Sequence, residues 1–398
     1  MKRGISLLMV SFLSLSLLFT GCGPKTETTT GTGANSGAGT SSQSDVIKIG
    51  VFEPITGANA GGGAQEVEGI KLANKLYPEV LGKKVELVIA DNKSDKVEAA
   101  NAAARLVEKE KVTAIIGSWG SSLSMAAGEI VKKAKVPTVG ASCTNPLVTQ
   151  GNEYYFRVCF IDPFQGTVMA NYTYNKLNAK KAAIIQEISN DYAVGLANFY
   201  TEAFKKLTKD DKCIVAVSNY NTGDNDFSAQ LTNIKSKNPD VIFAPGNYTE
   251  SALIISQARK LGITTPIIGG DTWETKEFLD IGKKDVEGAV FSAFFATEKP
   301  ITKESEKFLS EYKKQYNKDP DGTTALAYDA YILILDAIKK ANSTDTVKIR
   351  DELAKTKDFQ GAAGTITLDA DRNAIKSAVI KQVKDGKFTF MDIIEPQK

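Results

Sequence analysis

Short apolar runs alternate with amphipathic runs along most of this chain, and this alternation limits the fold more than any other feature. The first series of expected strands covers residues 46–52, 85–90, 112–116 and 136–139. The expected helices between them cover residues 66–76, 97–109 and 123–133. Strands that alternate with helices form parallel sheets with helices on both faces. The sequence therefore predicts an α/β fold.

The same alternation restarts further along the chain. Its expected strands cover 182–188, 213–217, 241–244 and 266–268, and its helices cover 195–207, 227–236 and 250–261. Two such units fit a length of 398 residues, which favours two domains. Residues 154–160 and 290–295 are predicted to be crossovers, with a turn at 162–166. A helix over 324–340 and three antiparallel strands, at 365–368, 378–383 and 388–394, are expected last.

The first 44 residues have a different character. Three residues with two basic side chains precede a mostly apolar run, Ile5–Phe19, of the length typical of a signal-peptide core. Residues 23–44 contain fifteen Gly, Ser or Thr among 22 residues, a composition typical of flexible linkers. We therefore expect a signal peptide over 1–21 and a tether over 22–44; the alternative is a buried N-terminal helix.

The absence of histidine limits the chemistry. The chain has no His among its 398 residues, which excludes Ser-His-Asp and Cys-His catalysis and removes the commonest transition-metal ligand. With a net charge of +2, the composition provides no argument for nucleic-acid binding. Cys143, Cys159 and Cys213 are widely spaced and are interpreted as small buried residues, with at most one disulfide among them. We predict no catalysis, no metal site and no cofactor.

In parallel sheets, ligands bind where strands end and helices begin. In the first unit, such positions carry small and hydroxyl residues, in Gly117–Ser122 and Gly140–Pro146. Glycines allow a ligand close to the backbone, and helix N–H groups with hydroxyls suit an anion. The alternative is that the serines only cap their own helix and that the second loop is a simple turn. Gly61–Gly63 matches no phosphate-binding motif and is expected to be a loop at the edge of a cleft.

Strand ends in the second unit carry aromatic and acidic residues. Tyr192 follows one strand, Tyr248 another, and Asp271 follows two glycines after a third. A carboxylate among flexible neighbours suits an ammonium group, although Asp is also a preferred helix cap. A carboxylate opposite a cluster of hydroxyl and N–H groups would bind a zwitterion.

Several segments together resemble a known family. The sequence carries Leu-Leu-Phe-Thr-Gly-Cys at 17–22, which is similar to the lipobox of bacterial lipoproteins except at Phe19. The chain from Val46 onward resembles the leucine/isoleucine/valine-binding branch of the substrate-binding proteins of ABC transporters, which have the type I periplasmic-binding fold. The segments that carry the resemblance are Pro54–Gly57, Gly117–Ser122, Phe160–Gly166, Asp191–Gly195 and Thr324–Ala330.

For the first unit, the resemblance implies that Ser121 binds the α-carboxylate of an amino acid beside the backbone near Trp119. Ser142 and Thr144 match a second loop, in which one residue offers its carbonyl to the ligand ammonium and the other its hydroxyl and N–H to the carboxylate. Gly62 stands where some relatives carry an aromatic residue, and Trp119 where some carry a smaller one. These two positions leave the side-chain preference open.

For the second unit, the resemblance implies that Asp271 pairs with the ligand ammonium and that Tyr192 lines the cleft. A further ligand-binding position of the family aligns with either Asn247 or Tyr248. Tyr328 matches a tyrosine at the rim of the cleft. We expect charge-assisted hydrogen bonds at Asp271 to dominate the affinity.

The resemblance further implies two Rossmann-like lobes joined by three crossovers and closing around the ligand. Residues 45–163 and 299–371 are expected to form lobe 1, and residues 164–298 and 372–398 lobe 2. The expected partners are an aliphatic amino acid, an ABC permease, and the membrane through a lipid on Cys22 of an extracytoplasmic monomer. Alternatives are a ligand-sensing module, a sugar, amide or peptide ligand, or an extracellular hydrolase.

Overall fold

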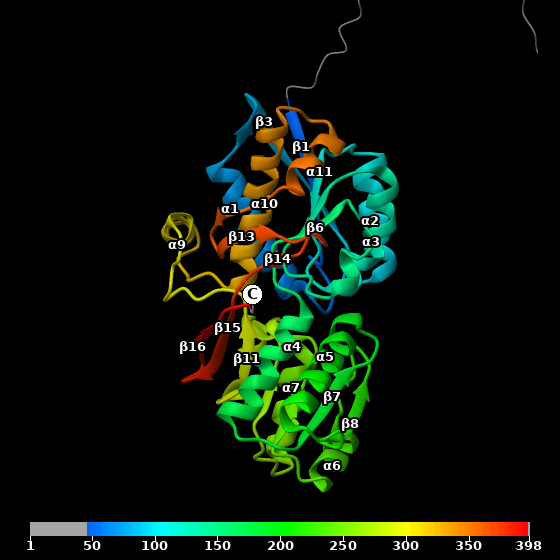
Figure 1. Cartoon of the computed structure of the whole chain (residues 1–398), viewed down its shortest axis with the longest axis vertical. Coiled ribbons are helices and arrows are strands. Elements are labelled where there is room, and N and C mark those ends of the chain that lie inside the picture. Colours follow the sequence, from blue (N-terminus) through cyan, green and yellow to red (C-terminus); the bar gives the residue numbers. More distant parts are fainter. Residues whose placement is uncertain (1–45, 397–398) are drawn as a thin grey trace, which may run out of the picture. The chain divides into compact units, whose positions relative to one another are not determined.

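The structure, a computed structural model, describes residues 46–396. The expected signal peptide, Cys22 and the whole of the expected tether lie outside the described residues. The described chain forms two α/β lobes, each with its own sheet (Figure 1). The alternation of strands and helices predicted from the sequence is confirmed.

Lobe 1 is a six-stranded sheet in the order β2-β3-β1-β4-β5-β6, parallel except for the short edge strand β2. Its strands are β1 (Val46–Glu53), β2 (Glu79–Val80), β3 (Lys83–Asp91), β4 (Ala114–Ile116), β5 (Thr138–Gly140) and β6 (Tyr155–Arg157). Its helices are α1 (Ala60–Leu76), α2 (Lys96–Glu108), α3 (Ser121–Ala134), α9 (Lys303–Tyr316), α10 (Gly322–Ala341) and α11 (Thr346–Leu353). Helix α1 packs on α10 and α2 packs on α3, so helices cover both faces of the sheet (Figure 1).

Lobe 2 is a seven-stranded sheet in the order β16-β15-β11-β10-β9-β7-β8. Its parallel strands are β7 (Ala182–Glu187), β8 (Ile214–Tyr220), β9 (Val241–Phe243), β10 (Ile267–Gly269) and β11 (Val290–Ala293). The antiparallel pair β15 (Ala378–Lys384) and β16 (Lys387–Ile394) extends one edge. Its helices are α4 (Asp162–Asn171), α5 (Asp191–Thr208), α6 (Ser228–Ser236), α7 (Tyr248–Lys260) and α8 (Lys276–Gly282).

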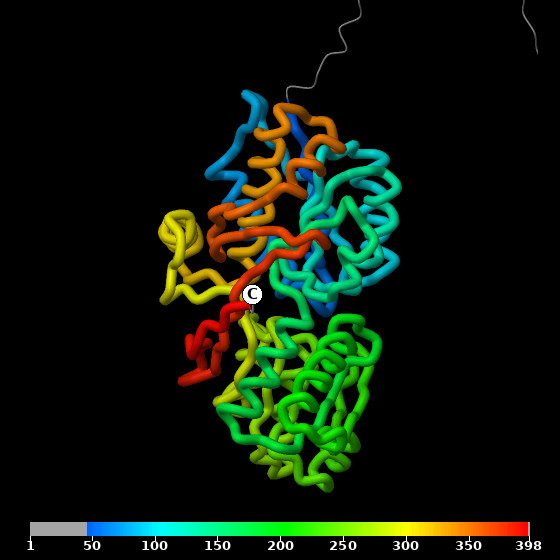
Figure 2. The backbone as a smooth tube through the Cα atoms, viewed as in Figure 1, coloured from blue at the N-terminus to red at the C-terminus, as the bar shows by residue number. Residues whose placement is uncertain are grey.

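The chain passes three times between the two sheets. It leaves lobe 1 after β6, returns after β11, and leaves again after a small antiparallel sheet of β12 (Phe359–Gly361), β13 (Gly364–Leu368) and β14 (Ala374–Ile375). The last passage is the orange-to-red segment that runs beside the first, green one in Figure 2. Each lobe is therefore built from segments that lie far apart in the sequence. Residues 154–160 were predicted to be a crossover strand and 290–295 another crossover. Strands β6 and β11 lie within these two ranges, and the chain crosses directly after each strand.

Two predicted irregular segments are helical. Gly61–Gly63, predicted as a loop, lies in the first turn of α1. Each glycine disfavours a helix by about 1 kcal/mol relative to Ala. Tertiary packing prevails because a Cβ on Gly63 would lie 2.1 Å from the carbonyl oxygen of Pro54. The turn predicted at Asp162–Gly166 is the start of α4, where proline occupies the first turn, a position that lacks intrahelical N–H bonds.

The three cysteines in the described part of the chain, Cys143, Cys159 and Cys213, are buried and free. This confirms their interpretation as small core residues. No described helix has both the length and the hydropathy needed to cross a membrane.

Candidate functional site

Two loops at the carboxyl end of the lobe 1 sheet form one wall of a cavity. The first loop leads from β4 to Ser121 at the start of α3, and the second follows β5. Ser121 Oγ accepts a hydrogen bond from the backbone N–H of Asn145 at 3.0 Å, which ties the loops together. The Trp119 N–H donates to Glu53 Oε2 at 2.7 Å, and the Ser142 hydroxyl donates to Glu66. Each of the two loops therefore donates a hydrogen bond to a buried carboxyl group.

Lobe 2 presents Asp271 to the same cavity. Asp271 begins a single 3₁₀ turn after β10, and its Oδ1 accepts hydrogen bonds from Gln165 Nε2 and, at 2.9 Å, from the Tyr192 hydroxyl. A Cβ on Gly270 would lie 2.1 Å from that hydroxyl, so glycine is required for this approach. Burial raises the pKa of Asp271 to about 6, and the two donors partly oppose the rise. At neutral pH the group is available as a carboxylate.

The cavity between these walls has a volume of about 80 Å³. Six of the nine residues predicted to bind ligand line it, three from each lobe: Trp119, Ser121, Ser142, Tyr192, Asn247 and Asp271. Neutral hydroxyl groups on lobe 1 thus share the cavity with a carboxyl group on lobe 2. This arrangement suits a ligand with a negative and a positive end.

The other three predicted residues do not line the cavity. Thr144 is fully buried beside Asp162, and its hydroxyl has no hydrogen-bond partner among the described residues. Tyr248 is buried against Trp119, with 6.0 Å between ring centroids, and its hydroxyl donates to the Ala58 carbonyl oxygen at 3.0 Å. Tyr328 was expected at the rim. It lies inside lobe 1 instead, because its hydroxyl donates to Glu304 on α9.

Glu187 and Asn59, which were not predicted to be site residues, also line the cavity. Glu187 is the last residue of β7 and is fully buried; its Oε2 accepts from Asn190 Nδ2 at 3.0 Å. Asn59 accepts from Asn247 Nδ2 at 3.0 Å across the lobes. An acidic residue at the carboxyl end of an otherwise apolar strand was the available signal for Glu187.

Polar contacts at the mouth of the cavity join the lobes. Asp191, at the start of α5 in lobe 2, accepts from the Ser122 hydroxyl at 2.7 Å and pairs with Lys96 Nζ at 2.8 Å. Its backbone carbonyl accepts from Asn145 Nδ2 at 2.8 Å. These contacts connect both lobe 1 loops to lobe 2, so the structure is a closed form.

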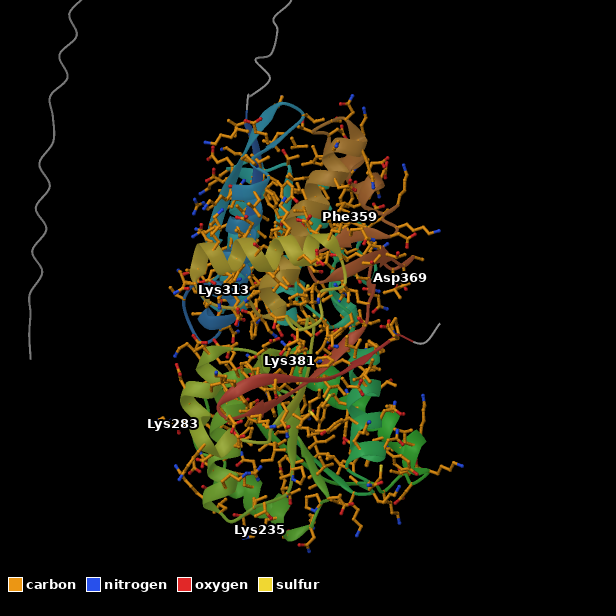
Figure 3. The ribbon with its side chains drawn as sticks, turned by 90° about the vertical axis from the view of Figure 1, so that its left-hand side faces the viewer. Lys235, Lys283, Lys313, Phe359, Asp369 and Lys381 are labelled. Atoms are coloured by element: carbon orange, nitrogen blue, oxygen red, sulfur yellow. The ribbon has the colours of Figure 1, made fainter. Side chains whose placement is uncertain are left out.

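A buried ion pair provides a second connection between the lobes. Lys381 on β15 pairs with Glu274, and both side chains are nearly inaccessible. In Figure 3, Lys381 lies near the boundary of the lobes, whereas Lys235 lies at the distant end of lobe 2. Glu274 Oε2 also accepts from the Gly322 N–H of lobe 1 at 3.3 Å, and its carbonyl accepts from Gln65 at 2.7 Å. Both members of the pair belong to lobe 2, so lobe 1 is joined to it only through the hydrogen bonds that Glu274 accepts from Gly322 and Gln65.

The two positions that left side-chain preference open are in contact. A Cβ on Gly62 would lie 2.3 Å from Cε2 of the Trp119 indole. The indole thus occupies the space that a side chain at 62 would fill, and it comes from a different loop. Trp119 is 3% exposed and lines the cavity, so it supplies an apolar wall.

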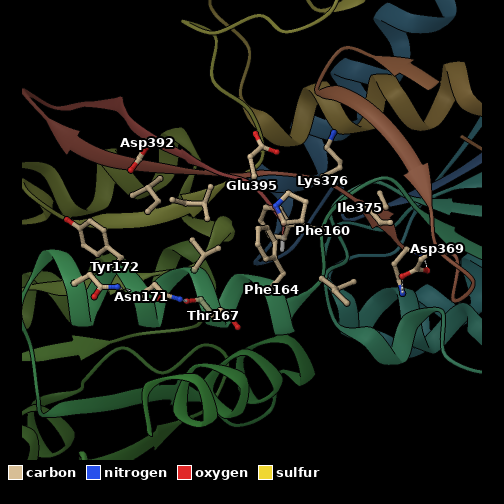
Figure 4. A pocket seen from close by; sticks show the side chains of 18 of the residues that line it. Phe160, Phe164, Thr167, Asn171, Tyr172, Asp369, Ile375, Lys376, Asp392 and Glu395 are labelled. Carbon is tan, nitrogen blue, oxygen red and sulfur yellow. Dashed lines mark hydrogen bonds between the residues drawn. The ribbon is translucent and has the colours of Figure 1, made fainter. Parts of the chain in front are cut away.

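A larger cavity, about 490 Å³, lies beside the crossovers (Figure 4). Figure 4 shows Phe160 and Phe164 on one side of it and Ile375 and Asp369 on another. None of the nine predicted residues lines it. Its lining also includes hydroxyl groups, on Thr167 and Tyr172, and carboxyl groups, on Asp369, Asp392 and Glu395. Among the described residues, no group of three or more Cys, Asp or Glu could hold a metal ion.

A family model described as "Periplasmic binding protein" matches residues 46–387. The chain belongs to the periplasmic binding protein family. This family consists of extracytoplasmic binding proteins rather than enzymes, which confirms the predicted family, the two-lobe fold and the non-catalytic class.

Three relatives of this periplasmic binding protein are informative. The solved structure of a leucine binding protein, LivK, from Thermotoga maritima is 45% identical with a TM-score of 0.85, covering 88% of this chain and 99% of that chain. LivJ from Streptococcus pneumoniae, a branched-chain amino acid transporter substrate binding protein in complex with isoleucine, is 36% identical with a TM-score of 0.82, covering 88% and 100%. A Leu/Ile/Val-binding protein homolog 3 from Brucella melitensis is 29% identical, over 81% of this chain and 86% of that protein.

Proposed function

We propose that this protein captures a branched-chain amino acid in the cavity between its lobes and delivers it to an ABC permease. The observation that carries the proposal is the position of Asp271 on lobe 2, in the same closed cavity as Ser121 and Ser142 of lobe 1. The ligand ammonium would pair with Asp271, and the α-carboxylate would accept from the lobe 1 loops. Each end of the ligand binds a different lobe, so binding stabilises closure.

Size supports an amino acid over a larger ligand. A water-sized group needs roughly 10–15 Å³ of such space. The closed cavity of about 80 Å³ therefore suits a single small zwitterion and is too small for a peptide or disaccharide.

The side-chain preference is proposed from Trp119 and Tyr192, whose rings line the cavity. Burying an aliphatic side chain against them contributes about 1.5–3 kcal/mol. The leucine and isoleucine named for the solved relatives support the same class of ligand.

The test is a thermal-shift and calorimetric screen with isoleucine, leucine and valine. A ligand that binds only the native state raises its melting temperature. Two analogues serve as controls: 4-methylpentanoic acid lacks the ammonium group and isoamylamine lacks the carboxylate. We expect shifts with the amino acids and none with either analogue. Equal shifts with 4-methylpentanoic acid would contradict the role of Asp271, and no shift with any amino acid would contradict the function.

We also propose that a lipid on Cys22 anchors the protein to the outer side of the cytoplasmic membrane. The proposal depends on the lipobox-like segment at 17–22 and on the Gly/Ser/Thr-rich tether after it. Mass spectrometry of the membrane-extracted protein should find an acylated N-terminal Cys22. A Cys22→Ser variant should be released from membranes. Unmodified protein in the membrane fraction would contradict the anchor.

A further inference from the structure

Glu53 and Glu66 form a buried pair behind the lobe 1 wall. Glu53 is the last residue of β1, Glu66 lies in α1, and both are fully buried. One oxygen of each is used by a loop that lines the cavity. Glu53 Oε2 accepts from the Trp119 N–H, and Glu66 Oε1 accepts from the Ser142 hydroxyl. The acid pair, Glu53 with Glu66, therefore links the two loops from behind.

The second oxygen of each acid is buried and lacks a donor of its own. Glu53 Oε1 and Glu66 Oε2 have no hydrogen-bond donor among the described residues, yet the two carboxyl groups are in hydrogen-bonding contact. Two carboxylates in contact cannot both be ionised in a buried site, and a proton between them satisfies both oxygens. Burial raises the pKa of Glu53 well above its usual range and that of Glu66 to about 7.

No neighbouring cation replaces that proton. Among the described residues, neither Glu53 nor Glu66 belongs to an ion pair. The titratable groups that face the pair from other elements are Asp321, which caps α10, the Cys143 thiol of the second loop and the Tyr155 hydroxyl of β6. Asp321 and Cys143 raise the pKa of the pair further. Arg157 is directed to the Cys143 carbonyl instead.

We propose that Glu53 and Glu66 share one proton and that the protonated pair positions the Trp119 and Ser142 loops for the ligand carboxylate. This inference rests on the proposed function, since the loops bind the amino acid there. When the pair loses its proton, the two carboxylates repel each other and the Trp119 and Ser142 anchors separate. Both acids are positioning residues, because neither lines the cavity. Ligand affinity then falls as pH rises.

The test compares the pH profile of isoleucine affinity for the parent with that for Glu66→Gln, from pH 6.5 to 9. The amide introduced by this substitution accepts from Ser142 and donates to Glu53, which reproduces the protonated pair without a titrating proton. Above the pKa of the pair, the competent fraction of the parent falls about tenfold per pH unit. Glu66→Gln should lack this fall. The titrations of Asp271 and of the ligand ammonium are common to both proteins and cancel in the ratio of affinities.

A matched control is Glu129→Gln on α3, because the side chain of Glu129 is 90% exposed. Its profile should follow that of the parent. Parallel profiles for the parent and Glu66→Gln would overturn the proposal. Glu53→Gln provides a second variant, since its oxygen can still accept from Trp119. Failure of both Gln variants to fold would also contradict the proposal, because each amide preserves the hydrogen bonds of a protonated pair.

A ligand-free measurement separates this inference from the proposed function. The melting temperature of Glu66→Gln minus that of the parent should increase with pH. The reason is that a carboxyl group with a raised folded pKa loses its stabilising contribution as pH rises through that pKa. If no amino acid binds but this difference still increases, the function is wrong and the shared proton stands. A difference that is constant with pH shows that the pair holds no extra proton, whatever the ligand result.

Discussion

The two walls of the cavity use buried carboxyl groups in different ways. In lobe 1, Glu53 and Glu66 lie behind the loops and contact only protein groups. In lobe 2, Asp271 reaches the cavity and is held by neutral donors from Gln165 and Tyr192. Burial raises the pKa in both places. The two sites differ in the groups that contact the buried carboxyl. In lobe 1 the neighbour is a second carboxyl group, so the pair retains a proton. In lobe 2 the neighbours are neutral donors, so Asp271 remains a carboxylate that can bind a ligand cation.

Removing the lobe 2 carboxylate should have the largest effect. Asp271→Asn keeps the size of the side chain and an oxygen that can accept from Tyr192, but it removes the charge. We expect isoleucine affinity to fall at least about 100-fold, or about 3 kcal/mol, the lower end for breaking a buried ion pair. Calorimetry measures the loss. Asp280→Asn on α8, 57% exposed, is the control and should bind as the parent does. An unchanged affinity for Asp271→Asn would leave lobe 2 without its proposed role.

A substitution at Gly62 should disturb the apolar part of the lobe 1 wall. A methyl group there would displace the Trp119 indole, so Gly62→Ala should destabilise the protein by about 1–3 kcal/mol, the cost of overpacking. It should also weaken isoleucine binding. Gly128→Ala is the matched control, because the nearest atom to its added Cβ is 3.7 Å away. Chemical unfolding measures both variants. Equal stabilities for the two would show that Trp119 does not depend on Gly62.

The fall of isoleucine affinity at acidic pH is expected to come from the protonation of Asp271 in lobe 2. The ammonium pairs with the carboxylate form of Asp271, whose pKa is about 6 without ligand. Affinity should therefore fall about tenfold for each pH unit below that value. In the ligand-free protein the sign is opposite: a raised folded pKa means that the stability contributed by Asp271 is complete below about pH 3.9 and is lost as pH rises through 6. A profile from pH 4.5 to 7 that is the same for Asp271→Asn would contradict this assignment.

The pair at the mouth should matter least. Lys96 and Asp191 join the lobes, but their side chains are 52% and 42% exposed. Exposed ion pairs contribute about 0.2–1 kcal/mol, so Lys96→Met should lower isoleucine affinity less than about fivefold. The effect should shrink further at high salt. A loss as large as that of Asp271→Asn would mean that the mouth, rather than the walls, determines affinity.

Periodicity predicted the fold well because buried strands and amphipathic helices each leave a local pattern. The errors lie where tertiary contacts override local preference. Gly61–Gly63 has the composition of a loop, yet it forms a helix because the backbone and Trp119 pack closely against it. Tyr328 was assigned by resemblance alone, and its partner Glu304, which is partly exposed, lies on α9, a helix that was not predicted from the sequence.

The candidate site was predictable where a strand end and a residue type coincide, as at Ser121 and Asp271. The sequence did not predict which acidic residues bind the ligand and which position the loops. Glu66 resembles an ordinary surface glutamate in the sequence, and only their places at the ends of strands mark Glu53 and Glu187. Their partners lie on other elements: Trp119 contacts Glu53 from 66 residues away, and Ser142 contacts Glu66 from 76.

A crystal structure of the protein with isoleucine would show directly which groups hold the two ends of the ligand. We expect one isoleucine between the lobes, with its ammonium nitrogen about 2.7–2.9 Å from an Asp271 oxygen, the range of charge-assisted hydrogen bonds. Its carboxylate should lie against the loops of Ser121 and Ser142. Isoleucine in the larger cavity beside the crossovers, or between the lobes with its ammonium away from Asp271, would contradict the account.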